Sequence, residues 1–479
     1  MRALRLFRSI STKDRPNSAR RSHDAKKRGM TVVFFSFMLV GMMGFLALSI
    51  DLGYVATVKT ELKRATDAGA LAGAGALVLG PDEAMERVTE YIQLNPVGGR
   101  TVLPEDVTVE LGHWDDQTRT FLASEQLPSA VRVQVEHPDQ PLFFARVLGQ
   151  DEFDLADESI AMYQPRDIVL VLDYSASMND DSELRNVDTM GAEFIESNLA
   201  TIHSELGSPT FGSMQWDETL PSSWSNWSVR NYLGLNSVSY PYPSGSWYDY
   251  VNYVKGSSLP SQYRHHFGYM TLMNYWLQRQ PKANQTPDLW KTSEQPITAL
   301  KNSVTVFLSF LQQVDTDDRL GLAVYTAQDG TATLEHELTA DFAAVEETSR
   351  HRQAGHYDYY TNIGAGINVG RQEIVDHGRT GAFKMIVLIT DGIANRPYDT
   401  VTAKQYAMDE AQLAADEGIP IVTISLGAGA DTWLMQDIAD LTGGIHFNVP
   451  GGQPVADYEE DLKQVFEDIA SDRPLKLVK

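Results

Sequence analysis

The sequence predicts an α/β protein whose main domain is a doubly wound, mostly parallel sheet. From residue 167 onward, short apolar segments alternate with segments of helical periodicity. Continuous apolar segments such as MIVLIT, residues 385–390, are typical of parallel strands that helices cover on both faces. A charge-free apolar run near the N-terminus adds a membrane helix, and a long aromatic-rich stretch interrupts the α/β pattern.

The chain has 479 residues, which is too long for one ordinary core, so several folded units are expected. We expect this order along the chain: a basic cytoplasmic tail at 1–29, a transmembrane helix at 30–50, an alanine- and glycine-rich helical extension at 51–80, a small α+β module at 81–165, and the α/β domain at 166–479 with an insertion at about 181–292.

The charge of the chain is unevenly distributed. The formal net charge is −25, yet residues 1–29 contain ten Lys and Arg against two Asp. The rest of the chain is therefore strongly acidic, which argues against nucleic acid as a partner because the phosphates would be repelled. The absence of cysteine excludes disulfides, thiolate metal sites and a cysteine nucleophile.

Met30 to Ile50 is a run of 21 residues without a charged side chain. At about 1.5 Å per residue, a helix of this length spans about 30 Å, the thickness of one hydrocarbon core. A buried core helix would show a polar face, which this segment lacks. A cleaved signal peptide remains an alternative, because small residues around Ala47-Leu48-Ser49 have a cleavage-like spacing. If the segment is retained, the Lys26-Lys27-Arg28 cluster stays cytoplasmic and places 51–479 on the other side of the membrane.

The membrane segment and the residues after it resemble a known family. A basic residue and Gly29 precede the apolar span, and Asp51-Leu52-Gly53 and an alanine-rich run around Asp67 follow it. This pattern resembles the N-terminus of TadE/TadG-like proteins of Tad (tight adherence) pilus assembly. Prepilin-like members of such systems carry a glutamate five residues after the cleavage glycine, and Phe34 stands there in this chain. The departure favours a permanent anchor in a bacterial inner membrane.

The region that follows contains a short helix and several strands. Residues 82–94 have helical spacing of apolar side chains, and from residue 101 the period changes toward two. We therefore expect a small β-rich module as far as about Gln164, without recognisable chemistry of its own.

The α/β domain shows five apolar strands separated by helices. We expect strands at 167–172, 319–325, 384–390, 419–426 and 445–448, and helices near 297–312, 362–377, 401–417, 432–441 and 455–470. In a parallel sheet, the loops at the carboxyl ends of the strands form the binding crevice.

Three loops at that edge carry oxygen ligands. Asp173, Ser175 and Ser177 follow the first strand, Thr361 precedes a helix, and Asp391 closes MIVLITDG. These side chains are two carboxylates and three hydroxyls, a set that suits a hard divalent cation. Because hydroxyls leave the cation's charge partly uncompensated, it could accept a carboxylate from a partner protein. The alternative is structural, since Ser and Asp at strand ends commonly cap helices and TDG commonly forms a turn.

These motifs resemble the metal-ion-dependent adhesion site of the von Willebrand factor type A domain, a Rossmann-like fold. Asp173, Ser175 and Ser177 match its D-x-S-x-S element, Thr361 its threonine element and Asp391 its final aspartate. The resemblance implies that the three hydroxyls coordinate a cation directly and the two aspartates do so directly or through water. The resemblance implies that the cation is Mg²⁺, with Mn²⁺ or Ca²⁺ as alternatives. It covers residues 166–479.

The insertion at about 181–292 separates the D-x-S-x-S loop from the helix that usually follows it. Six of the eight tryptophans of the chain lie between 216 and 290. So many rings need either each other or a partner to cover them. We expect either a self-packed subdomain or a recognition surface, and for the latter we name Trp224, Trp227, Trp247 and Tyr248 as candidate partner-binding residues.

These features predict a membrane-anchored component of Tad/Flp-type pilus assembly or adhesion that binds an acidic partner protein through a metal, outside the cytoplasm. The other partners we expect are further Tad pilus-assembly components and the inner membrane. One alternative is an envelope adhesin or scaffold unrelated to pili. Another is a metal-dependent hydrolase of the haloacid-dehalogenase type, but Ser175 stands where such an enzyme needs its second aspartate. Nucleophile-elbow and phosphate-loop motifs are also missing, so we do not expect an enzyme.

Overall fold

The computed structural model describes residues 24–479 except 116–117, 125, 313–315, 326–330, 428 and 451–454. Most of the basic tail that we predict at 1–29 lies outside the described residues. The chain forms two compact units. The first contains the described residues up to Thr66 together with Tyr91–Thr108 and Gln134–Glu158, and the second contains Asp67–Glu90, Val109–Val133 and Ser159–Lys479.

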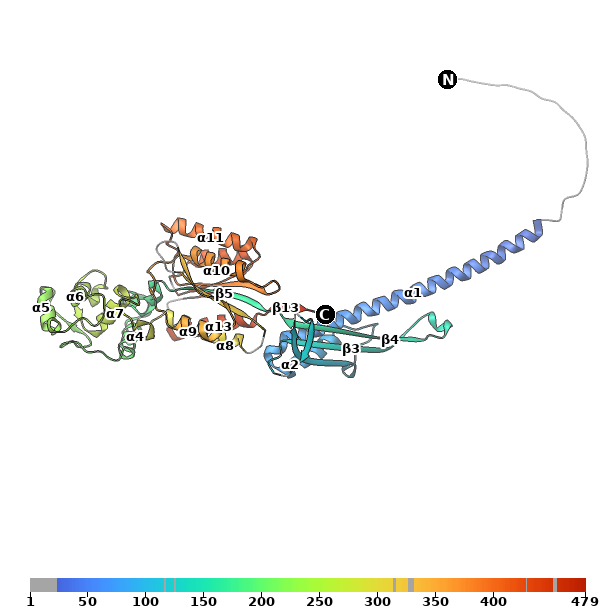
Figure 1. Ribbon diagram of the computed structural model, residues 1–479, viewed down its shortest axis with the longest axis horizontal. Coiled ribbons are helices and arrows are strands. Elements are labelled where there is room, and N and C mark those ends of the chain that lie inside the picture. The colour runs from blue at the N-terminus through green and yellow to red at the C-terminus, as the bar shows by residue number, and fades with distance from the viewer. Residues whose placement is uncertain are drawn as a thin grey trace, which may run out of the picture. The chain divides into compact units, whose positions relative to one another are not determined.

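A single long helix, α1, runs from Asp24 to Ala76 (Figure 1). Its most apolar window is entirely uncovered by protein, and its composition and length allow it to cross a membrane. After Asp51 the helix acquires a buried face that includes Val58 and Leu62. Farther along, a Cβ atom on Gly73 would lie only 2.3 Å from Val88 Cγ2. The small residues of this segment therefore allow a second helix to pack closely against it.

The second helix and five strands form the small α+β module. Helix α2, Pro81–Gln93, begins with a proline and two acidic residues, which suit a helix start. The strands are β1 (Val107–Asp115), β2 (Thr120–Ala123), β3 (Ala130–Pro141), β4 (Glu152–Tyr163) and β13 (Leu475–Leu477), in the order β13-β4-β3-β1-β2. The C-terminal strand β13 pairs antiparallel with β4. The last residues of the range expected for the α/β domain thus belong to this other sheet.

The main domain is a six-stranded sheet in the order β12-β11-β10-β5-β8-β9. Its strands are β5 (Arg166–Asp173), β8 (Arg319–Tyr325), β9 (Ala332–Thr339), β10 (Phe383–Thr390), β11 (Ile421–Leu426) and β12 (His446–Val449). All neighbours are parallel except β9, which runs antiparallel to β8 at one edge. The predicted mostly parallel α/β sheet is confirmed, and β9 was not predicted.

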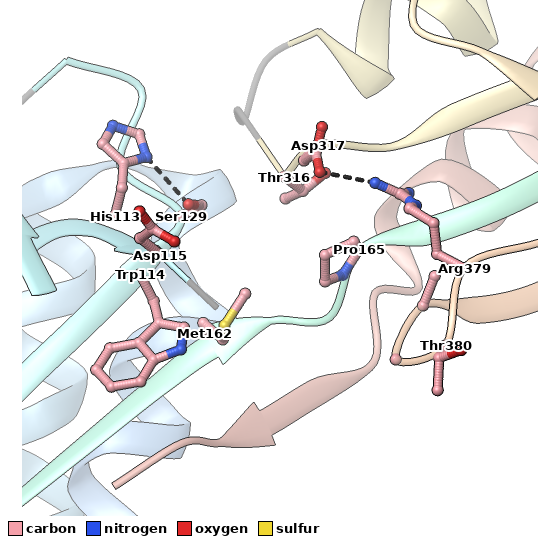
Figure 2. A pocket seen from close by; sticks show the side chains of 12 residues that line it. His113, Trp114, Asp115, Ser129, Met162, Pro165, Thr316, Asp317, Arg379 and Thr380 are labelled. Carbon is pink, nitrogen blue, oxygen red and sulfur yellow. Dashed lines mark hydrogen bonds and ion pairs between the residues drawn. The ribbon is translucent and has the colours of Figure 1, made fainter. Parts of the chain in front are cut away.

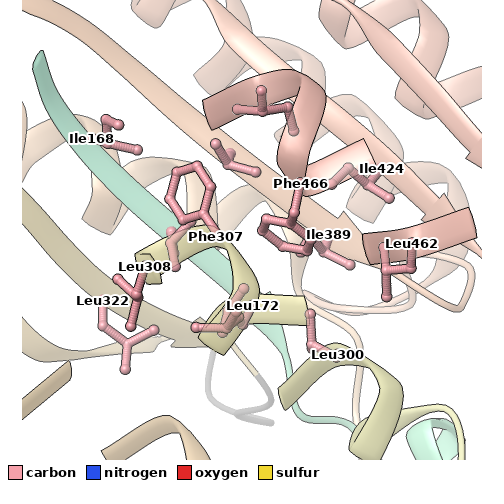
Figure 3. Close-up of a cluster of buried hydrophobic side chains, with 14 of the residues drawn as sticks. Ile168, Leu172, Leu300, Phe307, Leu308, Leu322, Ile389, Ile424, Leu462 and Phe466 are labelled. Carbon is pink, nitrogen blue, oxygen red and sulfur yellow. The ribbon is translucent and has the colours of Figure 1, made fainter. Parts of the chain in front are cut away.

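Helices cover both faces of this sheet (Figure 1). They are α8 (Ile297–Leu311), α9 (Phe342–Arg350), α10 (Ile363–His377), α11 (Thr400–Asp416), α12 (Thr432–Thr442) and α13 (Val455–Ser471). Strand β5 sends alternate side chains into two separate cores, one containing Ile168 and Leu172 and the other Val169 and Val171. Figure 3 shows the first core, where Phe307 of α8 and Phe466 of α13 lie with ring centroids 5.5 Å apart. Burial on both faces explains why β5 is a continuous apolar run.

A glycine brings α10 close to the sheet. A Cβ atom on Gly366 would lie 2.6 Å from the ring of Tyr325 and 2.7 Å from a methyl group of Val171. Only glycine permits this approach without displacing the buried ring. The start of α10, and with it Thr361, is therefore held near the carboxyl ends of β5 and β8.

The insertion between β5 and α8 is a subdomain with its own core. It contains α3 (Val187–Met190), α4 (Ala192–Glu205), α5 (Asn226–Tyr232), α6 (Trp247–Lys255), α7 (Tyr269–Arg279) and a hairpin of β6 (Glu218–Thr219) and β7 (His266–Phe267). Trp276, Tyr250 and Phe267 are fully buried in this core. The rings of the insertion therefore cover one another, which is the self-packed arrangement of the two we considered.

A buried ionic cluster ties the start of the sheet to the end of the domain. Arg166 Nη2 lies 3.0 Å from Asp318 Oδ2, and Arg473 Nη1 lies 3.1 Å from the same oxygen. The backbone N–H of Arg166 also donates to Asp318 Oδ1 at 2.8 Å. All three side chains are almost completely buried. One carboxylate thus neutralises two guanidinium groups away from water.

We expect Asp318→Asn to lower the free energy of unfolding of this domain by roughly 3 kcal/mol, because two buried cations lose their counter-charge. The matched control is Asp317→Asn, since the Asp317 carboxylate is 78% exposed and pairs with Arg379 at the surface. The control should change stability by less than about 1 kcal/mol. Thermal unfolding of the full chain in detergent, followed by circular dichroism, compares the two. Equal effects would contradict the assignment of the buried cluster as a stabilising contact.

Candidate metal centre

The two aspartates of the predicted site lie at the ends of neighbouring parallel strands. The register of β10 against β5 aligns Leu388 with Val171, and two residues later Thr390 lies beside Asp173. Thr390 Oγ1 donates to Asp173 Oδ2 at 2.8 Å. Asp391 follows directly, so the sheet places both carboxylates at the same edge.

A chain of hydrogen bonds through the serine loop connects Asp173 with Asp391. The Ser175 N–H donates to Asp173 Oδ1 at 2.8 Å, and the hydroxyls of Ser175 and Ser177 lie 2.9 Å apart. Ser177 Oγ donates to Asp391 Oδ1 at 2.7 Å. Ser175 stands where a cap would precede the short helix that starts at Ala176, yet its side chain makes no capping bond. The capping alternative therefore does not explain this serine.

Thr361 joins the same group from the start of α10. Its N–H donates to Asn395 Oδ1 at 3.1 Å, and its carbonyl accepts from Asn395 N at 2.9 Å. A Cβ atom placed on Gly392 would lie 3.4 Å from Thr361 Oγ1 and 3.5 Å from Ser177 Oγ. Asn362, not Thr361, caps α10, accepting from Ala365 N. The structure thus brings all five predicted site residues to one edge of the sheet.

The site concentrates negative charge away from water. Burial raises the pKa of the Asp173 carboxyl, against the hydrogen bonds it accepts from Ser175 and Thr390. Burial and then the nearby charge of Asp173 raise the pKa of Asp391 well above its ordinary value. Two buried carboxylates in this position are unfavourable without a positive charge between them.

The donor set fits a hard divalent cation because every candidate ligand atom is oxygen. Among the residues that the structure describes, no group of three or more His, Asp or Glu side chains could hold a metal. Any cation at this edge would thus depend on the hydroxyls of Ser175, Ser177 and Thr361 as well as on the aspartates.

Exposed apolar side chains lie on the segments that follow β10 and β11, and the sequence analysis missed them. Ile393 follows the TDG turn, Tyr398 is 86% exposed in the same loop, and Trp433 is 82% exposed at the start of α12. The loop before α12 contacts the site, since Asp431 N donates to Gly392 O at 3.3 Å. The sequence could have indicated these residues, because the segments that follow two parallel strands such as β10 and β11 begin at the same carboxyl edge of the sheet.

The structure divides the four aromatic residues that we named as candidate partner contacts in the insertion. Trp247 is buried, and its Nε1 donates to Val238 O at 2.9 Å. Trp224 is partly buried against the ring of Tyr232. Trp227 and Tyr248 are 62% and 50% exposed. Only the last two present a large surface that a partner could contact, because the core of the insertion covers Trp247.

The end of the insertion packs on the loop that leads to Thr361. Gln353 Nε2 donates to Pro281 O at 2.6 Å. Lys282 Nζ lies 3.3 Å from Asp358 Oδ1, and the Tyr359 hydroxyl donates to Gln285 Oε1 at 3.2 Å. These contacts couple the insertion to one of the loops of the candidate metal centre.

The second unit contains two pockets that differ from each other in their lining residues. The larger, of about 620 Å³, contains a His113–Ser129 hydrogen bond and an Arg379–Asp317 ion pair (Figure 2). It includes none of the predicted site residues. The smaller, of about 110 Å³, adjoins Asp391 and is also lined by Asp180 and Asp181. It extends the acidic character of the candidate metal centre.

Comparison with protein families identifies three regions, of which the first two overlap. Residues 29–76 match a Flp pilus-assembly TadE/G-like family, residues 68–161 match a Tad-like Flp pilus-assembly family, and residues 290–458 match the von Willebrand factor type A domain. The last match begins at the end of the insertion, so β5 and the Asp173 loop precede it. Among curated proteins, none matches the sequence.

Several solved structures have a limited likeness to the chain. A von Willebrand factor type A protein from Catenulispora acidiphila is 11% identical, with 75% of this chain and 48% of that chain covered and a TM-score of 0.29. The pilus adhesin SpaC from Lactobacillus rhamnosus GG is 13% identical, with 76% and 34% covered and a TM-score of 0.33. The PilB minor pilin from Streptococcus sanguinis is 11% identical, with 89% and 98% covered and a TM-score of 0.37.

The family matches agree with the architecture described above. An apolar N-terminal helix leads into the Tad-type region, and a von Willebrand factor type A domain follows. The chain therefore has the TadG-like arrangement, in which a TadE/G-like membrane segment and a Tad-type module carry a C-terminal von Willebrand factor type A domain.

Proposed function

We propose that the chain is a membrane-anchored component of Tad/Flp-type pilus assembly or adhesion whose C-terminal domain binds a partner protein through a divalent cation. The observation that carries this proposal is the convergence of Asp173, Ser175, Ser177, Thr361 and Asp391 at one buried edge of the sheet. The Tad-type regions of the same chain supply the pilus context. The proposal assigns no catalytic step.

The cation would be held by the hydroxyls of Ser175, Ser177 and Thr361, with Asp173 and Asp391 acting directly or through water. Mg²⁺ suits this oxygen set, and Mn²⁺ or Ca²⁺ are the alternatives. Where the aspartates act through water, the direct protein ligands are neutral hydroxyls, and the cation stays electrophilic. A carboxylate of a partner protein, such as another Tad pilus-assembly component, would complete its coordination.

The partner would also contact the apolar rim of the centre, which we define as Ile393, Tyr398 and Trp433. These side chains are exposed; Ile393 and Tyr398 lie in the loop after β10, and Trp433 lies at the start of α12, whose preceding residue Asp431 contacts Gly392. Exposed aromatic residues around a charged anchor point are typical of binding energy hot spots. Trp227 and Tyr248 of the insertion are two further exposed aromatic residues that the same or another partner could contact.

The N-terminal helix would cross the bacterial inner membrane once and would not be cleaved. Lys26, Lys27 and Arg28 precede the apolar run, and this excess of positive charge favours a cytoplasmic N-terminus. Both Tad-type and von Willebrand factor type A regions would then lie in the periplasm or beyond it.

Metal binding is tested on the full chain in detergent after treatment with a chelator. We expect calorimetry to detect Mg²⁺ and Mn²⁺ binding to the wild type, and Thr361→Val to weaken it at least about tenfold, which is about 1.4 kcal/mol. Valine keeps the shape of threonine and removes only the hydroxyl ligand. Asp173→Ala should abolish binding and, in the source bacterium, should also abolish surface pili or adhesion.

Thr400→Val is the matched control for metal binding, because Thr400 is exposed at the first position of α11. Its affinity for both metals should equal that of the wild type. A folded wild-type chain that binds neither metal would refute the metal-dependent part of the proposal.

The buried carboxylates predict how stability changes with pH when the metal is removed. The folded-state pKa of Asp391 lies above its unfolded value, so the folded state holds more protons there than the unfolded state. In a chelator, stability should therefore fall as the pH rises above the ordinary range of a carboxyl group, and added Mg²⁺ should reverse the fall at the high-pH end. The melting temperature of the full chain in detergent measures this.

Asp391→Asn isolates the contribution of that site. Burial also raises the pKa of Glu183, and that of Glu294 to about 8, so part of the fall comes from other groups. The variant should show a shallower fall than the wild type because one of the titrating groups is gone. An unchanged slope would contradict the electrostatic account of the site.

Fusion of a reporter after Lys479 tests the orientation. A reporter that is active only outside the cytoplasm, such as alkaline phosphatase, should be active in this fusion. Replacing Lys26, Lys27 and Arg28 by alanine should reduce that activity because the orientation signal is weakened. Activity of a reporter that functions only in the cytoplasm would contradict the proposed orientation.

A further inference from the structure

The connection between β3 and β4 exposes an unusual number of large apolar side chains. Phe143 and Phe144 are 47% and 44% exposed, and Val147 and Leu148 are 84% and 87% exposed. The segment Ala145–Leu148 is a 3₁₀ turn, so these side chains project from a short ordered loop. Surface loops in water are usually polar, and a cluster of this kind indicates a contact with an apolar phase or a partner.

A carboxylate attaches this loop to the helix α1. Asp51 Oδ1 accepts from Phe143 N at 2.9 Å, and Asp51 Oδ2 accepts from Phe144 N at 3.0 Å and from Ala145 N at 2.6 Å. The rings of Tyr54 and Phe143 also pack edge to face with centroids 5.0 Å apart. Asp51 is the first residue after the apolar run that ends at Ile50. The loop is therefore held at the boundary of the predicted membrane span.

The tip of the loop reaches along the span itself. A pocket of about 230 Å³ is lined by Gly44, Ala47 and Leu48 of α1 and by Phe144, Val147 and Leu148 among the loop residues. Gly44 precedes Asp51 by seven residues, which is about 10 Å along a helix. The loop thus lies beside the last two turns of a segment whose side chains no other part of the described chain covers.

The single charged side chain of the loop suits the polar boundary of a membrane. The segment LFFARVLG, residues 142–149, contains Arg146 and no acidic residue. Arg146 is exposed, and its guanidinium donates to Leu142 O at 3.1 and 3.3 Å. A cationic head on a flexible stem beside apolar side chains can reach lipid phosphates while its neighbours stay in the acyl region.

We propose that Phe143–Leu148 is a membrane-inserted wedge, which seats its apolar side chains among the acyl chains of the phospholipid leaflet in which the apolar run of α1 ends. Arg146 lies at the headgroup phosphates of that leaflet. The proposal rests on the proposed membrane anchoring of α1, and it adds a second contact with the bilayer. We assign a phospholipid leaflet as the contact of these side chains, because the exposed loop continues the uncovered apolar surface of the helix.

Site-directed spin labelling of the full chain in nanodiscs of phosphatidylethanolamine and phosphatidylglycerol tests the wedge. The chain has no cysteine, so each substitution to cysteine gives one labelled position. Leu148→Cys reports on the wedge and Phe37→Cys on the centre of the span. Val401→Cys is the matched control, an apolar residue that is 80% exposed on α11. Oxygen collides preferentially with labels in lipid, and a soluble nickel complex collides preferentially with labels in water.

The proposal expects the oxygen-to-nickel collision ratio at Leu148 to shift to the range of Phe37, far from that of Val401. An aqueous label at Leu148 with a lipid-exposed label at Phe37 would overturn the wedge and leave the anchor intact. Aqueous labels at both positions would overturn both. Loss of collisions with both reagents at Leu148 would show burial against another protein, such as a second copy of the chain. That result would also contradict insertion of the loop into lipid.

A second variant tests the attachment of the loop. Asp51→Ala in the Leu148→Cys background removes the acceptor of three N–H groups. The label at Leu148 should then move toward water, while the label at Phe37 stays in lipid. Retention of the Leu148 label in lipid would contradict the role of Asp51 in positioning the wedge.

Discussion

The parallel pairing of β5 and β10 is the constraint on which the candidate metal centre depends. Because both strands run in the same direction and are buried, their carboxyl ends must coincide at one edge. Asp173 and Asp391 therefore lie close together where water is scarce, and burial raises the pKa of both. The same register that forms the core thus creates a position that favours a cation. Fold and proposed function share one geometric cause.

The rest of the centre is brought to this edge by packing rather than by strand pairing. Gly366 lets α10 approach Tyr325, which carries Thr361 toward the two aspartates. The insertion has its own core, yet its last segment holds the loop before Thr361 through contacts such as Gln353 with Pro281. A partner that contacts the insertion would therefore act on a loop that contributes a proposed ligand. Self-packing and recognition are compatible roles for this subdomain.

A different carboxylate organises the first unit. Asp51 accepts three backbone N–H groups from one loop, and the charge of Arg146 in that loop also favours its ionised form. These bonds satisfy donors that the turn at Ala145 would otherwise leave without partners. The aspartate of the Asp-Leu-Gly sequence thus has a physical role in the structure. It holds an apolar loop beside the segment of α1 that is long and apolar enough to cross a membrane.

The sequence by itself determined the α/β class, the five parallel strands and the residues of the oxygen cluster, because apolar runs and spaced motifs are local signals. It missed the edge strand β9, whose polar Glu335, His336 and Glu337 hide the strand pattern, and β13, which is only three residues long. Only the tertiary structure decided that Trp247 is buried while Trp227 is exposed. Only the tertiary structure shows that Asp51 accepts hydrogen bonds from a loop 92 to 94 residues away. Burial and long-range pairing depend on how elements pack, which no local pattern encodes.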